Sequence, residues 1–407
     1  MILENSINTS FWLKLSLVNL LLVAVMGVLM RYKICFEFPM LDQKNLQLAH
    51  SNFAFTGWVT QTLMVFMISY LKQHFPLLKM TAYLNMLRVN SIVAYGTILT
   101  FVLAGYSLSS ISFLVLTILI GFWFAIQFIL DLRGLRDISV NWFRAALFYM
   151  SLSTIGTFSL AYMMLDKHID QHMYLASIYW YLHFQYNGWF FFACVGLFLN
   201  AVRSYIPDTN KLRLIFYLFF AGGIISYILS VLWLNLSIGF IVLAAMGAIL
   251  QMWGWIKLVL LLKQPLSLLF KEKPAFFRFV FYVLGLAITV KLLLQLGSTI
   301  PMVSNLAFGY RPVVIAYLHL ILLAIISVSL LLFIWLSGYL RYTKQTTLIM
   351  GVVITLIYIN QVVLGIQGMT SFVNIVVANL NEYLLVIAIL LVLSILRLVF
   401  HLRVKVS

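Results

Sequence analysis

Long hydrophobic segments follow one another along the whole chain, separated by short stretches that contain charged residues, proline, asparagine or glycine. An apolar segment of about 20 residues is long enough to cross the hydrocarbon core of a bilayer as a helix. We therefore predict an all-α, polytopic membrane protein in which residues 1–407 form a single transmembrane helical domain. Cutting at the polar breaks gives about twelve spans, near residues 11–31, 47–71, 81–106, 108–131, 142–165, 174–202, 213–233, 236–262, 275–297, 312–338, 346–366 and 380–400.

The composition supports the membrane class, since 64% of the 407 residues are hydrophobic and only 9% are charged. A water-soluble domain could not cover its surface with so few charged side chains, so the lipid bilayer is the first expected partner. The segment near residues 11–31 follows Glu4 and lacks an early basic cluster or a small-residue cleavage site. We therefore predict that it is a retained span and not a cleaved signal.

The formal net charge of +16 could suggest nucleic acid, but the basic residues collect in alternate loops. Lys and Arg gather on the cytoplasmic side of membrane proteins, so this pattern predicts orientation and no nucleic-acid partner. It places both termini in the cytoplasm, and we expect a multi-pass protein of the plasma (inner) membrane. The loop that contains Arg31, Lys33 and Lys44 is an exception. The basic loops contain Lys72 and Lys79; Arg133, Arg136 and Arg144; Arg203, Lys211 and Arg213; Lys263, Lys271, Lys273 and Arg278; Arg341 and Lys344; and Arg403 and Lys405.

Three histidines fall inside predicted spans: His50 in the second, His183 in the sixth and His319 in the tenth. With the predicted orientation they lie roughly 5, 13 and 10 Å below the outer membrane edge, at 1.5 Å of rise per residue. A hydrogen bond between helices would explain any one of them. Three at similar depth favour a metal or haem site, because neutral imidazole is a preferred ligand of haem iron, copper and zinc.

The segments around these histidines, LQLAHSNFAFTGW, YLHFQYNGWFFF and IAYLHL, resemble those of the catalytic subunit of the haem-copper oxidase and nitric oxide reductase superfamily. The resemblance implies a haem-copper oxidase subunit I fold. It also implies that His50 and His319 correspond to the two axial ligands of the low-spin haem, and that His183 takes a copper-ligand position. Tyr317 stands where that family has the histidine of its high-spin haem.

The positions at which the chain departs from this family are as informative as those at which it resembles the family. The seventh span, near residues 213–233, contains no histidine, so two of the three copper ligands are missing and copper is not expected. With Tyr317 in place of the high-spin ligand, the chain is not expected to be a competent terminal oxidase, and whether it is an enzyme is left open. The family's arginine pair is also missing, although Arg311 or Arg31 could meet the haem propionates from the same face. No Cys-x-x-Cys-His attachment sequence is present, so the expected cofactor is haem b.

Three functions are consistent with these features. The first is an integral membrane haem protein that holds one low-spin bis-histidine haem for electron transfer or for a function related to O₂ or NO. It would work with other respiratory membrane subunits, or with a quinol or cytochrome donor. The second is a cofactor-free respiratory assembly or scaffold subunit. The third is a transporter that uses intramembrane histidines, against which the absence of paired, Gly/Pro-broken short spans counts.

Other polar residues within the spans have simpler expected roles. Arg88, Lys257 and Lys291 lie within reach of span ends and are expected to extend their cationic groups to the membrane surface. Gln185, Asn187, Gln251, Asn360 and Gln361 either line an interior polar path or hydrogen-bond between helices. The outer-loop sequence DKHIDQH, with His168 and His172, has a spacing suited to Zn²⁺ or Cu²⁺, but a solvated acidic loop is favoured. Neither Cys35 nor Cys194 supports a disulfide or a thiolate metal site.

Overall fold

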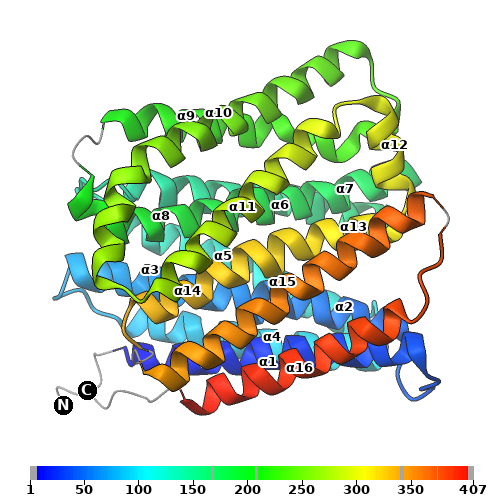
Figure 1. Cartoon of the computed structure of the whole chain (residues 1–407), viewed down its shortest axis with the longest axis horizontal. Coiled ribbons are helices and arrows are strands. Elements are labelled where there is room, and N and C mark those ends of the chain that lie inside the picture. The colour runs from blue at the N-terminus through cyan, green and yellow to red at the C-terminus, as the bar shows by residue number, and fades with distance from the viewer. Residues whose placement is uncertain (1–6, 167–168, 207–209, 340–342, 374, 402–407) are drawn as a thin grey trace. The chain divides into compact units, whose positions relative to one another are not determined.

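The computed structural model describes residues 7–166, 169–206, 210–339, 343–373 and 375–401, and the regular elements in these ranges are all helices (Figure 1). In chain order they are α1 (Thr9–Cys35), α2 (Gln43–Phe53), η2 (Ala54–Thr60), α3 (Gln61–His74), α4 (Thr81–Ala104), α5 (Leu108–Asp131), α6 (Val140–Asp166), α7 (Gln171–His183), η3 (Phe184–Phe190), α8 (Phe191–Val202), η4 (Arg203–Tyr205), α9 (Asn210–Ile225), η5 (Ser226–Leu234), α10 (Ile238–Leu269), η6 (Phe270–Glu272), α11 (Ala275–Gly297), α12 (Pro301–Gly309), α13 (Arg311–His319), η7 (Leu320–Ser327), α14 (Val328–Leu336), α15 (Lys344–Phe372) and α16 (Leu380–His401).

Among the described residues, eleven helices are long and apolar enough to cross a membrane, which confirms the multi-pass membrane class. They match eleven of the predicted segments. The remaining segment, predicted at 174–202, is also helical, as α7, η3 and α8 run on without a break. Its centre carries His183, Gln185 and Asn187, and these polar side chains lower its mean hydropathy.

Short polar residues fix where several helices begin. The side chains of Asn8, Asp42, Ser107 and Asp170 each accept a hydrogen bond from the backbone N–H three residues further on. Such N-caps satisfy donors that the first helical turn leaves without a partner. The turn between α4 and α5 depends on Gly105, whose φ of +55° favours glycine, and it confirms the predicted break between 106 and 108.

The helices form two compact units, each made of segments that are not contiguous in sequence. Within the first unit, α1 and α16 lie side by side (Figure 1). The first unit comprises Met1–Arg133, Ser327–Leu364 and Val377–Ser407, and the second comprises Gly134–Ile326 and Gly365–Val376.

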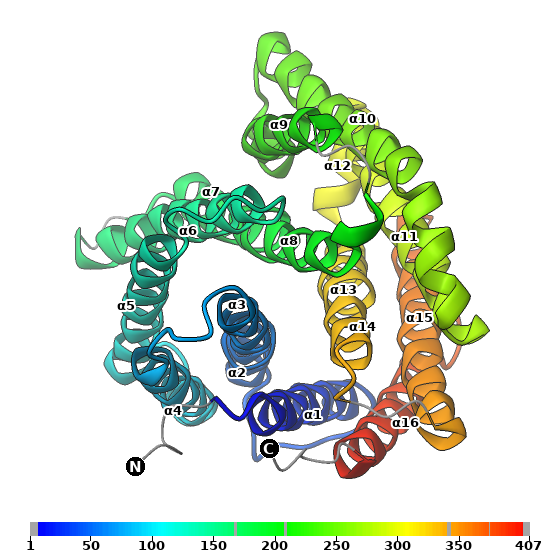
Figure 2. The same ribbon diagram turned by 90° about the vertical axis from the view of Figure 1, so that its left-hand side faces the viewer.

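The centre of the first unit is the long helix formed by α2, η2 and α3. It is enclosed by α1, α4 and α14 (Figure 2), and 83% of its most apolar window is buried. Trp58 donates from Nε1 to Oγ of Ser327 at 2.8 Å, and the rings of Phe66 and Phe333 meet edge to face. A helix that is buried over most of its apolar window contacts mainly other helices and little lipid.

In the second unit, α9 packs along α10 (Figure 1). Glycines allow the two backbones to approach closely. A Cβ atom on Gly247 would lie 2.9 Å from the backbone nitrogen of Ser226, and one on Gly222 would lie 3.1 Å from the carbonyl oxygen of Gly247. Close approach through small residues is the usual way in which membrane helices gain packing contacts.

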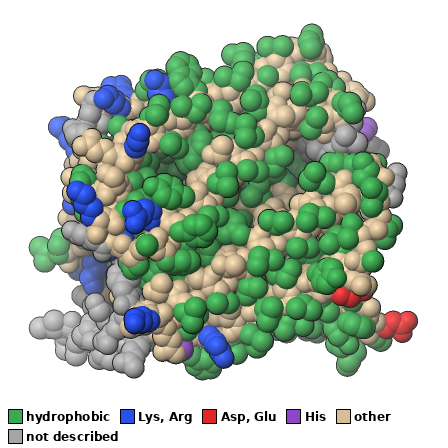
Figure 3. All heavy atoms as spheres, viewed as in Figure 1, with side chains coloured by type: hydrophobic (Ala, Val, Ile, Leu, Met, Phe, Trp, Pro, Cys, Tyr) green, Lys and Arg blue, Asp and Glu red, His purple; other side chains and the backbone are tan. Residues whose placement is uncertain are grey.

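The surface shown in Figure 3 has hydrophobic side chains along the length of the helices. The visible Lys and Arg side chains lie toward the left-hand side of this view. This is the distribution expected for helices whose sides face lipid and whose ends face water.

Candidate functional site

Each of the three intramembrane histidines lies beside a segment of π-helix. His183 immediately precedes η3, His319 immediately precedes η7, and His50 lies four residues before η2. A π-helical turn is wider than an α-helical turn, leaves some carbonyl groups without their usual partner, and occurs frequently at functional sites. The structure therefore marks the three histidine segments as locally unlike the rest of their helices.

His50 points towards α1. Its Nδ1 atom lies 3.0 Å from the carbonyl oxygen of Val23, and its side chain is half-buried. The nearest part of α1 also includes Gly27, where a Cβ atom would lie 3.7 Å from Cε1 of the imidazole. The side of α1 that contains Val23 and Gly27 thus forms one wall beside the histidine.

Arg31 lies one helical turn beyond Gly27 on α1 and therefore on the same side of that helix. The side chain is half-buried. Because α1 ends four residues later, at Cys35, the guanidinium lies between the level of His50 and the end of the helix. This is a suitable place for a cation that pairs with an acidic group near the membrane surface.

His319 is held by its own helix. Its Nδ1 atom lies 2.8 Å from the carbonyl oxygen of Ile315, and the side chain is half-buried. Tyr317, also half-buried, lies two residues earlier. Arg311 is exposed at the first position of α13, about two turns before His319, so it lies near the end of the helix.

The hydrogen bonds of His50 and His319 select one form of the imidazole. A carbonyl oxygen accepts only, so Nδ1 must donate its proton, and in the neutral ring the lone pair is then on Nε2. A metal-binding histidine usually has this arrangement, with the second ring nitrogen donating to a carbonyl or carboxylate. Both residues therefore present the ring form that a haem ligand requires, and their assignment as ligands stays a prediction.

His183 is bonded differently. Its side chain is 1% exposed, its Nε2 lies 2.9 Å from the carbonyl oxygen of Gly223, and its Nδ1 lies 3.2 Å from Nδ2 of Asn187 and 3.4 Å from Oγ of Ser230. Nε2 must donate to the carbonyl, and Nδ1 then accepts from the other two groups. Both ring nitrogens are engaged, which favours a structural role for His183 over the copper-ligand role implied by the family resemblance.

The glycine pair Gly222–Gly223 on α9 makes this contact possible. A Cβ atom on Gly223 would lie 2.7 Å from the hydroxyl oxygen of Tyr149, so a larger residue would force the buried tyrosine side chain to shift. Within the described residues, no group of three or more His, Cys, Asp or Glu side chains could hold a metal ion.

Gln251 extends the polar cluster of the second unit. Its Nε2 donates to the carbonyl oxygen of Gly222 at 3.2 Å and to Oγ of Ser226, while its Oε1 lies 3.5 Å from Nζ of Lys291. Gln185 similarly donates to Oγ of Ser153. For these glutamines, the structure shows hydrogen bonds between helices, one of the two roles that the sequence left open.

Lys291 corrects an expectation from the sequence. The prediction that it reaches the membrane surface is wrong, because its side chain is 7% exposed and lies among the helices of the second unit. Arg88, in contrast, is exposed, and Lys257 lies over the ring of Trp253. Lys291 lies six positions before Gly297, the last residue of α11. At that distance from a helix end, the sequence alone does not tell whether a lysine side chain points to the membrane surface or inwards.

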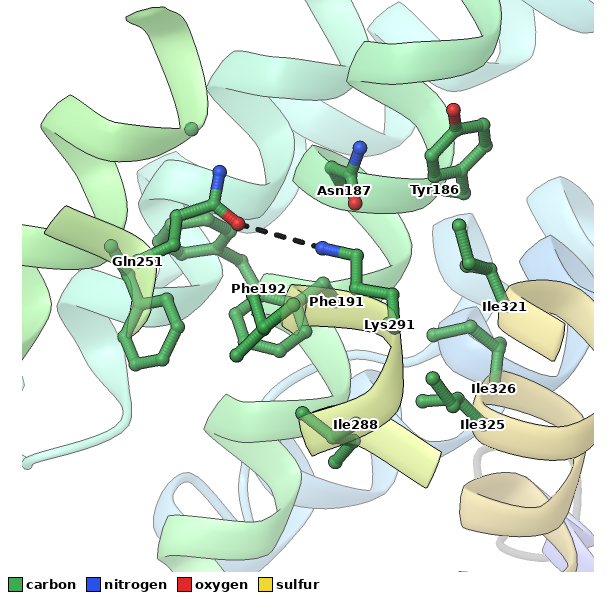
Figure 4. A pocket seen from close by; sticks show the side chains of 13 residues that line it. Tyr186, Asn187, Phe191, Phe192, Gln251, Ile288, Lys291, Ile321, Ile325 and Ile326 are labelled. Carbon is green, nitrogen blue, oxygen red and sulfur yellow. Dashed lines mark hydrogen bonds between the residues drawn. The ribbon is translucent and has the colours of Figure 1, made fainter. Parts of the chain in front are cut away.

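The Nζ atom of Lys291 borders a small cavity (Figure 4). The cavity measures about 20 Å³, which is room for an ordered water molecule and far too little for a porphyrin. Its walls are mainly phenylalanine and isoleucine side chains, with the amides of Asn187 and Gln251 as polar groups. The second unit thus has an internal polar site, and His319 is not among the residues that line it.

In the first unit, the polar side chains around η2 are neutral. Asn19 donates to the carbonyl oxygen of Gly57, and Asn90 donates both to the carbonyl oxygen of Thr56 and to Oε1 of Gln61. Two carbonyl groups of the π-helical segment thereby gain partners from neighbouring helices. These asparagines were missed at the level of sequence, although buried amides inside apolar spans are a recognisable signal.

The structure also describes His172 and Asp170 of the outer loop and both cysteines. His168 lies outside the described residues, and His172 is exposed with its ring 5.9 Å from that of Trp233. Asp170 caps α7, which is a structural role. Cys35 and Cys194 are both free cysteines.

In comparisons with known proteins, no family model matches the chain, and none of the curated proteins matches it. The assignment of function therefore depends on the residues and their geometry.

Proposed function

We propose that the chain is an integral membrane haem-binding protein that uses His50 and His319 as the two axial ligands of one low-spin haem b. The observation that carries this proposal is the contrast among the three histidines. His50 and His319 are half-buried and direct Nδ1 to a backbone carbonyl, whereas His183 is fully buried and uses both ring nitrogens. The same two residues correspond to the low-spin haem ligands in the family that the sequence resembles.

The surrounding residues would support this role. The carbonyl groups of Val23 and Ile315 fix the rotation of the two imidazoles and, in the neutral ring, place the lone pair on Nε2. Gly27 lets α1 lie close to His50, because a Cβ atom at this position would already be in van der Waals contact with the imidazole. Arg31 and Arg311, near the ends of α1 and α13, would pair with propionates.

When bound, haem b supplies one-electron redox chemistry. Two imidazoles would fill both axial positions, which favours electron transfer with a quinol or cytochrome donor, or a role beside other respiratory subunits, over direct reduction of O₂. The proposed location is the plasma (inner) membrane, with both termini in the cytoplasm.

The test is a reduced-minus-oxidised optical difference spectrum of the full chain, purified after expression with ample haem. We expect the bands of a low-spin b-type haem and a slow reaction of the reduced protein with carbon monoxide. A purified, folded protein without a Soret band would contradict the proposal and would favour the cofactor-free scaffold role.

The proposed orientation has a separate test. Reporter fusions after Lys79, Lys211 and Lys344 should read cytoplasmic, and a fusion between His168 and His172 should read external. The reverse pattern would place the histidines nearer the cytoplasmic face and would contradict the outer position proposed for Arg31 and Arg311.

A further inference from the structure

Lys291 is a cationic residue inside a membrane-spanning helix that lacks a carboxylate partner within the described part of the chain. Its Nζ lies 3.5 Å from an amide oxygen, that of Gln251, and the ion pair found in the described ranges joins Arg203 to Asp137 instead. An ammonium group inside the bilayer is costly and usually marks a functional position. Lysine, unlike arginine, changes its protonation state readily when it is buried.

The groups around Lys291 can hold water. Asn187 donates a hydrogen bond from Nδ2 to His183, so its Oδ1 remains as an acceptor. Gln251 likewise donates from Nε2 to Gly222 and Ser226, and its Oε1 is the acceptor. In Figure 4 the ammonium group points to the side of the cavity where these two amides lie. A cavity of about 20 Å³ with several polar neighbours meets the requirements for an ordered water molecule.

A second observation links this cavity to the end of α11. Gln295 lies one helical turn after Lys291, on the same side of the helix, and only two residues before the helix ends at Gly297. Its side chain is 6% exposed, yet Oε1 has no hydrogen-bond partner among the described residues. Buried amide oxygens normally have a partner, and water is the usual one where protein supplies none.

We propose that Lys291 is an internal proton-binding site that exchanges protons, through water beside Gln295, with the membrane face at which α11 ends. In this exchange the ammonium gives one proton to water and becomes a neutral amine, and the amine takes a proton back by the reverse step. The titratable side chains nearest to the site are Tyr186, which lines the cavity, and His183, which reaches it through Asn187. The walls contributed by α9, α10 and η7 contain no carboxylate.

The test uses the full chain in lipid nanodiscs with isotope-labelled lysine side-chain nitrogen, observed by NMR. The signal of Lys291 is assigned by its loss in Lys291→Met or, should that variant not fold, in Lys291→Arg. We expect the signal to change between ammonium and amine at a pH different from that of exposed lysines such as Lys271. We also expect Gln295→Leu to slow its exchange with water by about tenfold, as the loss of one hydrogen-bonded step would.

Gln264→Leu is the matched control, because Gln264 is an exposed glutamine on the neighbouring α10. It should leave the exchange at the wild-type rate. A Lys291 signal that titrates with the exposed lysines, or that exchanges equally fast in Gln295→Leu, would overturn the proposal. Neither result depends on haem, so this test and the optical test of the proposed function can fail separately.

Discussion

The helix of His50 and the helix of His183 both contain a π-helical segment near the histidine, but the two imidazoles differ in the hydrogen bonds that they make. In the first unit, Asn19 and Asn90 donate to two π-helical carbonyls, and His50 directs its Nδ1 to a backbone carbonyl of α1. In the second unit, His183 is itself the centre of the network and joins Gly223, Asn187 and Ser230.

This difference distinguishes histidines that the sequence placed at similar depth. All three histidines lie within helices that the sequence predicts to cross the membrane, and the hydrogen bonds of each ring separate them into two classes. In the neutral ring, a histidine whose Nδ1 donates to a carbonyl carries its lone pair on Nε2, whereas one that donates from Nε2 carries it on Nδ1. On this basis, ligand chemistry is expected at His50 and His319, and packing at His183.

The largest effect is expected from loss of a predicted ligand. His50→Ala and His319→Ala should each abolish the low-spin haem spectrum, because iron that loses one imidazole becomes five-coordinate. The measurement is the optical spectrum of each purified variant. His74→Ala is the control, since His74 makes the same kind of Nδ1 bond, to Tyr70, outside the predicted site. If both variants kept the parent spectrum, the ligand assignment would be wrong.

A smaller effect, on stability, is expected at the π-helical segment of the first unit. Asn90→Leu removes the donor to Thr56 and Gln61 and leaves two buried oxygens without it. We expect a loss of about 1–3 kcal/mol in unfolding free energy, measured by denaturant or thermal unfolding in detergent. Asn85→Leu on the exposed side of α4 is the control and should change stability little. An unchanged stability of Asn90→Leu would show that these bonds do not hold the segment.

His183→Asn should separate packing from ligation. The change leaves the carbonyl of Gly223 without its histidine donor, and we expect a loss of about 1–2 kcal/mol in stability. Any haem spectrum should stay as in the parent protein. Loss of the haem bands in a variant that is still folded would mean that His183, and not one of the other two histidines, is a ligand.

The smallest effect is expected at Arg31. Arg31→Gln removes the cation one turn from Gly27 while keeping most of the side chain. Because the group is partly exposed, we expect about 1 kcal/mol, or about fivefold weaker retention of haem. The measurement is transfer of haem to an excess of an apoprotein acceptor, with the exposed Arg88→Gln as the control. Equal rates in the two variants would remove Arg31 from the site.

Much of the fold follows from the sequence, because hydropathy determines which segments are buried in lipid. The predicted break between 106 and 108 agrees with the turn at Gly105, whereas the helices capped by Asp42 and Asp170 begin at Gln43 and Gln171, a few residues before the predicted starts at 47 and 174. The π-helical segments were not predicted, and at η2 the donor to the carbonyl of Thr56 comes from Asn90 on another helix, a contact that hydropathy does not reveal. The burial of Lys291 was missed for a related reason: near a helix end, a flexible cation can point to the surface or inwards, and the neighbouring helices decide.

The most direct test of the central claim is the near-infrared magnetic circular dichroism of the oxidised, haem-loaded wild-type protein, which reports the identity of both axial ligands of low-spin iron. We predict the signature of two neutral imidazoles, as His50 and His319 would provide. A high-spin signal, or a low-spin signal with any other ligand pair, would contradict the account.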